Sequence, residues 1–261
     1  MRNFIQLMTV ILLAMQANLG FSMNCENHQD ALEEIHNAFD ALLKKYVTGA
    51  GVKYSAWRNN DADMDKLQKY VAFLETQNPE CWSRDDGLAY WINLYNAATV
   101  RLILQNYPVK SIKDLGNFIK TPWKKRIVSV AGRELTLDQI ENKIIRPQFE
   151  DARIHFALNC ASIGCPPLAP FAFRADSLEL LLEAVTKNAL SDEKYVKVEK
   201  DIVRVTKIFD WYEEDFVKES GSVRDFLAHY LPEQKHIFLN KNVRIENLSY
   251  SWKLNQAGDQ P

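Results

Sequence analysis

The sequence has little net charge, no long apolar run beyond its first residues, and no low-complexity linker or repeat. Its 261 residues include 32 Lys and Arg against 34 Asp and Glu, a formal net charge of −2. This balance gives no electrostatic basis for binding nucleic acid, because neutralising phosphates needs a basic excess or stripe. No later apolar run approaches the length of a membrane span. A disordered chain is also excluded, because 47% of the residues are hydrophobic and 13 Phe, 10 Tyr and 6 Trp can build a core.

Residues 1–22 have the pattern of a secretory signal peptide. Arg2 supplies a positive charge, and the stretch 4–19 is mostly apolar but too short to favour a membrane span. Gly20 and Ser22 are small residues at the −3 and −1 positions of a cleavage site after residue 22. We therefore expect export to the periplasm or the extracellular space.

The rest of the chain predicts one α+β domain, in which helices pack on a small, mostly antiparallel sheet. Apolar residues recur every three or four positions over 28–47, 62–77 and 85–107, as helices require. The third run is apolar on nearly all sides, so we expect a long, buried central helix. The other predicted elements are an extended piece at 52–57, a hairpin turning at 131–132, a capped helix from Thr136 to Pro147, a strand at 151–159, a helix at 176–190, a hairpin at 195–205, helices at 209–218 and 223–231, and a strand at 248–254.

Because the chain has no long linker and no repeat, we expect a single folded domain. After the signal peptide we assign an N-terminal helix to 23–49, a single domain to 50–255 and a C-terminal tail to 256–261.

The four cysteines bear on both stability and chemistry. Cys25, Cys81, Cys160 and Cys165 are an even number, and export places them where disulfides persist. Of the three pairings, Cys160 with Cys165 and Cys25 with Cys81 is the simplest. A bridged Cys165 would be unable to act as a nucleophile, so the redox state decides between the functional hypotheses.

The densest group of reactive side chains lies between residues 151 and 167. In a strand, His155 and Asn159 share one face, and Cys165 follows in a loop between Gly164 and Pro166. A cysteine on a rigid loop near a histidine suits nucleophilic catalysis, because the imidazole lowers the thiol pKa and carries the proton. We predict Cys165 as the nucleophile and His155 as the base.

Three further polar residues are candidates for the same site. Asn93 and Asn96 are three positions apart and therefore neighbours on the long helix. They either join the helix to loop backbones or orient His155 and stabilise an oxyanion. Glu141 supplies a charge near the same region, where an ion pair is the commoner role. The candidate site thus comprises Cys165, His155, Asn93, Asn96 and Glu141.

Several segments resemble the family called domain of unknown function 547. In order along the chain they are 91–97 (WINLYNA), 111–114 (SIKD), 131–132 (AG), 135–141 (LTLDQIE), 153–158 (RIHFAL), Cys160, 165–168 (CPPL), 208–216 (IFDWYEEDF) and 250–255 (YSWKLN). The resemblance covers about residues 50–255. One departure is Gly164, where members of the family often have a serine before the cysteine.

The resemblance implies a fold more than an activity, because the family is defined by its unknown function. Bacterial members resemble this chain as exported single-domain proteins. A long buried helix against a sheet that carries a histidine is also similar, by analogy, to papain-like and transglutaminase-like folds. Those folds have a cysteine at the start of the central helix, whereas 83–89 contains none and Cys81 precedes it.

Three functional hypotheses follow. The first is a cysteine-dependent hydrolase or acyl transferase that acts on a peptide, amide or thiol substrate through Cys165 and His155. The second is a non-catalytic envelope binding or interaction domain in which Cys160 and Cys165 form a disulfide. The third is a metal-binding domain with His155, Cys160 and Cys165 as ligands, although this spacing lacks the usual paired thiolates and a fourth ligand. We assign no cofactor and no metal site, and we predict neither a nucleic-acid partner nor a stable membrane span.

Overall fold

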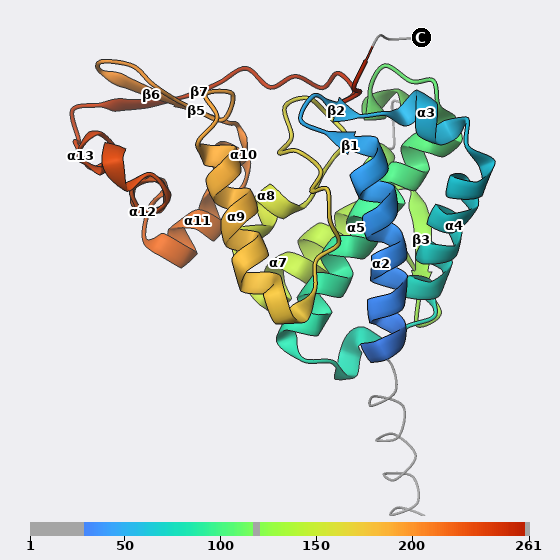
Figure 1. Cartoon of the computed structure of the whole chain (residues 1–261). Helices are drawn as coiled ribbons and strands as arrows, with labels where there is room; N and C mark the ends of the chain where they lie inside the picture. The colour runs from blue at the N-terminus through green and yellow to red at the C-terminus, as the bar shows by residue number, and fades with distance from the viewer. Residues whose placement is uncertain (1–28, 117–120, 259–261) are drawn as a thin grey trace, which may run out of the picture.

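The computed structural model describes residues 29–116 and 121–258, and these form an α+β fold rich in helices (Figure 1). The predicted signal peptide and Cys25 lie outside the described residues. No helix within the described residues is long and apolar enough to cross a membrane.

Three long helices form the first part of the fold, as the hydrophobic periodicity predicts. They are α2 (Gln29–Tyr46), α4 (Asp61–Glu75) and α5 (Arg84–Asn106). The side chains of Asn60 and Ser83 cap the backbone at the starts of α4 and α5. Every residue of α5 from 87 to 104 is buried, which confirms a central helix covered on all sides (Figure 1).

The link between α2 and α4 differs from the prediction. A two-residue hairpin, β1 (Val47–Thr48) and β2 (Gly51–Val52), leads into the short helix α3 (Tyr54–Arg58). The extended piece predicted at 52–57 is therefore wrong beyond Val52. Tyr54 and Trp57, three positions apart, turn the same way into the core as helical neighbours.

The predicted hairpin at 131–132 is confirmed by β3 (Arg126–Val130) and β4 (Arg133–Thr136). The Thr136 and Gln139 capping box also forms and begins α6 (Leu137–Gln139). The helix then widens into a π-helical turn, Ile140–Ile145, and continues as α7 (Arg146–Phe149). Pro147 does not close the helix, because it lies in the first turn of α7, where a missing N–H is tolerated.

The strand predicted at 151–159 is wrong. The segment contains the one-turn helix α8 (Ile154–Ala157), and most of it is buried. Ile154 and Ala157 pack into one hydrophobic core and Phe156 packs into another. The alternation in the sequence therefore reflects two apolar surroundings instead of a core face and a solvent face.

The second half of the chain builds a smaller unit around a three-stranded sheet. After α9 (Leu178–Leu190), the predicted hairpin forms as β5 (Val196–Val198) and β6 (Ile202–Val205), and β7 (Arg244–Asn247) pairs parallel to β6. The strand predicted at 248–254 is misplaced, since β7 ends before it. The helices of this unit are α10 (Ile208–Trp211), α11 (Glu213–Ser220), α12 (Val223–Tyr230) and α13 (Lys235–Phe238).

Within the described residues two hydrophobic cores result, and three small sheets stand in place of one. The first core joins α2, α3, α4, α5 and the β3–β4 hairpin, and the second joins the β5–β6–β7 sheet to α10, α11, α12 and α13. Residues 248–257 run back from the second to the first (Figure 1). The backbone N–H of Asn255 donates to Ala161 O at 3.2 Å, and Val52 N donates to Asn255 O at 2.8 Å. This returning segment places its side chains where the two cores meet.

Candidate functional site

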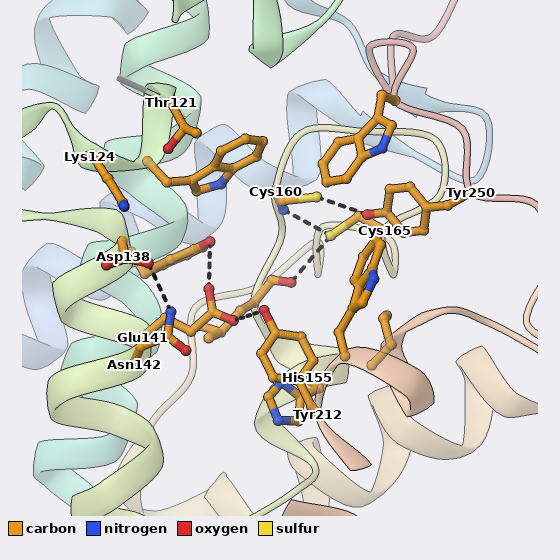
Figure 2. Close-up of a pocket in the computed structure, with 16 residues that line it drawn as sticks. Thr121, Lys124, Asp138, Glu141, Asn142, His155, Cys160, Cys165, Tyr212 and Tyr250 are labelled. Carbon is orange, nitrogen blue, oxygen red and sulfur yellow. Dashed lines mark hydrogen bonds between the residues drawn. The ribbon is translucent and has the colours of Figure 1, made fainter. Parts of the chain in front are cut away.

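A cavity of about 380 Å³ lies where the two cores and the returning segment meet (Figure 2). It collects residues from α5, the π-helical turn, α8, the cysteine loop 158–168, α10 and the C-terminal segment. Its walls are strongly aromatic. The aromatic lining residues are Tyr95, Trp123, Trp211, Tyr212, Tyr250 and Trp252.

The thiol of Cys160 faces this cavity and is held by hydroxyl groups. Its Sγ lies 3.1 Å from both Ser162 Oγ and Tyr250 Oη, and these two oxygens lie 2.9 Å apart. Burial raises the pKa of the thiol, but hydrogen bonds from Cys165, Ser162 and Tyr250 outweigh burial, so the pKa of Cys160 is lowered. A lower pKa means more thiolate at neutral pH, and the thiolate is the nucleophile.

The backbone next to Cys160 adopts an unusual conformation. Ala161 has a φ of 58°, in the left-handed region that residues other than glycine rarely occupy. The Asn159 side chain supports this turn by accepting a hydrogen bond from Ala161 N at 3.0 Å and donating one to Pro166 O at 2.8 Å. The loop is thereby fixed at the position that presents the Cys160 thiol.

Gly164 makes room for the ring that contacts this thiol. A Cβ at this position would lie 2.8–2.9 Å from three ring atoms of Tyr250, closer than real contacts allow. The missing side chain at Gly164 is thus what lets the Tyr250 ring approach Cys160.

Cys165 lines the same cavity, but its surroundings are different. Its Sγ accepts a hydrogen bond from Cys160 N at 2.9 Å, and its thiol donates to Leu158 O at 3.6 Å. Burial and the hydrogen bond to Cys160 raise the pKa of Cys165 well above the usual value. Both cysteines are free thiols, so the disulfide predicted between them is not formed in this structure.

His155 lies in the wall of the cavity and is held from two sides. Its Nε2 lies 2.7 Å from Asp215 Oδ2, and its ring stacks on Tyr212 with centroids 3.9 Å apart. Arg146 donates to both oxygens of Asp215, at 2.6 and 3.0 Å. Partial burial raises the pKa of Asp215, but His155 and Arg146 outweigh it and hold that pKa well below its usual range.

Glu141 projects from the π-helical turn into the same cavity. Its two oxygens accept hydrogen bonds from Tyr212 Oη at 2.6 Å and from Tyr95 Oη at 3.1 Å (Figure 2). Burial and the nearby carboxylate raise the pKa of both tyrosines, which keeps them as donors. The π-helical turn is a common feature of functional sites, because it redirects a side chain within a helix.

Asn93 and Asn96 do not line the cavity. The Asn93 amide donates to Phe173 O at 2.8 Å, and its carbonyl oxygen accepts from Phe173 N at 2.9 Å. Asn96 donates to Ala157 O at 2.9 Å and accepts from Asn159 N at 2.8 Å. Both amides join α5 to backbone groups of other segments, which is one of the two roles that the sequence left open.

The structure thus brings Cys165, His155 and Glu141 to one cavity and places Asn93 and Asn96 behind it. His155 Nε2 is hydrogen-bonded to Asp215. Within residues 29–116 and 121–258, the His155 ring makes no hydrogen bond to the thiol of Cys160 or of Cys165. In that same part of the chain, no group of three or more His, Cys, Asp or Glu side chains is placed to hold a metal ion.

Sequence reasoning missed most of the residues that shape this cavity. Ser162 follows Cys160 by two positions, but its contact with the thiol depends on the turn at Ala161. Asp215 and Tyr212 belong to an aromatic and acidic run that has the composition of an ordinary amphipathic helix. Tyr250 is separated from Cys160 by 90 positions, so no local pattern connects them.

Comparison with known proteins finds one family match. Residues 79–189 match the model of the family described as "Protein of unknown function, DUF547". This confirms the resemblance for the stretch that contains α5, the π-helical turn and both cavity cysteines. The aromatic residues at 211–212 and 250–252 lie outside the matched stretch. Neither a curated protein nor a solved structure matches the chain.

Proposed function

We propose that the protein is an exported, cysteine-dependent enzyme that acts on an acyl or thiol substrate in the aromatic cavity. The observation that carries this proposal is the Cys160 thiol, which faces the cavity and hydrogen-bonds to two hydroxyl groups at 3.1 Å. Because hydroxyl donors favour the thiolate, Cys160 suits nucleophilic attack better than the predicted Cys165 does. Cys165 is buried, and its thiol already donates to a carbonyl oxygen.

The rest of the cavity supports substrate binding around this thiol. A volume of about 380 Å³ lies at the small end of the range for ligand sites, and mixed aromatic and polar walls are typical of such sites. His155 and Glu141 stand in the wall opposite the cysteine loop, each fixed by hydrogen bonds, as Figure 2 shows for Glu141. They act here as groups that position a substrate, since neither contacts the thiol.

The test is the rate at which Cys160 reacts with iodoacetamide as the pH is varied. The reduced protein is alkylated briefly, and the modified thiol is located by peptide mass mapping. We expect Cys160 to react first, with a midpoint below the ordinary cysteine pKa of about 8.5. Cys165→Ser serves as the matched control, because it removes the neighbouring thiol and keeps the nucleophile.

Alkylation of Cys160 no faster than that of a free cysteine at pH 7 would contradict the proposal. That result would instead favour the non-catalytic binding domain. If Cys160 reacts fast, thioester and activated ester probes then distinguish acyl from thiol chemistry, with Cys160→Ser as the inactive variant.

A further inference from the structure

We propose that Cys160 and Cys165 work together as an attacking thiol and a resolving thiol, and that the substrate of the cavity is a disulfide. This inference rests on the proposed function, since it needs Cys160 to be the nucleophile. It adds the class of substrate and a role for the second cysteine.

The cysteine loop brings the two sulfur atoms together. The backbone turns at Ala161, and Cys165 N donates to Ser162 O at 3.1 Å, which closes the loop. As a result Cys165 Sγ lies 2.9 Å from Cys160 N, and Figure 2 shows the two sulfur atoms side by side. Rotation of the side chains is the kind of motion that would bring the sulfurs into bonding distance.

The two thiols differ in the way that a sequential mechanism requires. Cys160 is half-buried and lies within the hydroxyl cluster, so a substrate that enters the cavity meets it first. Cys165 is only 7% exposed, so it is less accessible than Cys160. Accessible, lower-pKa cysteines beside a second thiol are typical of thiol–disulfide chemistry.

The groups around Cys160 also favour a disulfide over an amide. Cleavage of an amide needs a group that protonates the departing nitrogen. Within the described residues the side-chain partners of Cys160 are Ser162, Tyr250 and Cys165, and none is a histidine or a carboxylate. Attack on a disulfide expels a thiolate, which departs without prior protonation.

The reaction balances as a two-electron exchange. The Cys160 thiolate attacks one sulfur of R–S–S–R′, a mixed disulfide between Cys160 and R–S forms, and R′–S⁻ leaves. Cys165 then loses its proton to solvent and attacks Cys160 Sγ, and R–S⁻ leaves as the Cys160–Cys165 disulfide forms. The substrate is reduced to two thiols and the protein dithiol is oxidised. A second dithiol compound restores the protein by the same steps in reverse.

The experiment exposes the purified, fully reduced protein to oxidised glutathione and follows the products by mass spectrometry after acid quenching. The wild type should show the Cys160–Cys165 bridge on peptide mapping, with a loss of two hydrogen atoms from the segment that carries these two cysteines. Cys165→Ser should instead accumulate a glutathione adduct on Cys160, because nothing resolves it. Cys160→Ser should form neither product at a comparable rate.

The outcomes separate this inference from the proposed function. Rapid alkylation of Cys160 combined with a stable glutathione adduct on the wild type, and no internal bridge, would overturn only the inference. Slow alkylation of Cys160 would contradict both the proposed function and this inference. The wild-type measurement decides the matter even if a variant fails to fold, because it needs no substitution.

Discussion

Two pairs of polar residues, one on α5 and one on the cysteine loop, have opposite surroundings. Asn93 and Asn96 do not line the cavity, and each amide makes two hydrogen bonds to backbone groups. Cys160 and Cys165 line the cavity, and the Cys160 sulfur is held by two side-chain hydroxyls, one on Ser162 nearby and one on Tyr250, 90 positions away. The sequence predicted Asn93, Asn96 and Cys165 for one site, and gave Cys160 only as a disulfide partner or metal ligand.

The difference shows how a structural pair and a chemical pair can be told apart. Backbone partners fix a side chain in one orientation and satisfy groups that burial would otherwise leave unpaired. Side-chain hydroxyls around a thiol change its charge state instead, because they stabilise the anion. The first arrangement contributes to the stability of the fold, and the second contributes to reactivity.

The largest expected effect is on stability, from Asn93→Ala. The substitution leaves the backbone N–H and C=O of Phe173 without partners in a buried environment, so we expect a loss of about 2–4 kcal/mol. Urea denaturation measures this loss. The iodoacetamide rate of Cys160 should stay at the wild-type value in the folded protein. An unchanged denaturation midpoint would end the structural interpretation of this asparagine.

Much of the fold could be predicted from the sequence because local rules dominate it. Three-residue and four-residue spacing located α2, α4 and α5, and the Thr136–Gln139 capping box located α6. The rule failed for 151–159, where one turn of helix is buried between two cores and alternation loses its usual meaning. Periodicity describes one apolar face, and this segment has two.

The candidate site was only half predictable for a related reason. Cys165, His155 and Glu141 carry reactive groups, so their residue types alone were enough to select them as candidates. The preference for Cys160 comes from Tyr250, which reaches it from the other end of the chain, and from a left-handed Ala161 that no propensity favours. Contacts over such separations follow from the tertiary fold.

The second prediction concerns Asp215 of α11, whose side chain bonds both Arg146 of α7 and His155 of α8. Asp215→Asn keeps the shape but removes the charge that faces His155 and Arg146, so we expect a loss of about 1–3 kcal/mol at pH 7. The pKa of Asp215 is lowered in the folded protein. Its contribution is therefore fully present above the unfolded-state value of about 3.9 and is lost as the pH falls further.

Thermal unfolding of both proteins between pH 3 and pH 7 provides the measurement. The gap between wild type and Asp215→Asn should narrow as the pH falls below about 4. A gap that is constant across this range would show that the charge of Asp215 does not contribute, and that shape alone matters at this position.

A third prediction links the two kinds of residue through Gly164. Gly164→Ala places a methyl group against the Tyr250 ring, so the ring must move, at a cost of about 1–2 kcal/mol. The displaced hydroxyl should no longer favour the Cys160 thiolate, and alkylation at pH 7 should slow. Gly49→Ala is the matched control, because nothing lies within 4 Å of its Cβ position. If the two variants had the same stability and the same alkylation rate, the contact between residue 164 and the Tyr250 ring would not matter, and the prediction would be wrong.

The smallest expected effect comes from Tyr250→Phe, and it tests the comparison most directly. The ring and its packing against Trp211 and Trp252 remain, while one hydrogen bond to the Cys160 sulfur is lost. A bond worth about 1 kcal/mol corresponds to roughly fivefold less thiolate at fixed pH, so alkylation should slow by that factor and its midpoint should move to higher pH. Alkylation quenched at set times and followed by mass spectrometry gives both the rate and the midpoint.

The other hydroxyl donor remains on Ser162. Ser162→Ala should therefore also slow the alkylation of Cys160, and the double variant should slow it further. If Tyr250→Phe lowered the denaturation midpoint strongly and left the rate unchanged, the hydroxyls would be structural like the amides on α5, and the distinction between the two pairs would fail.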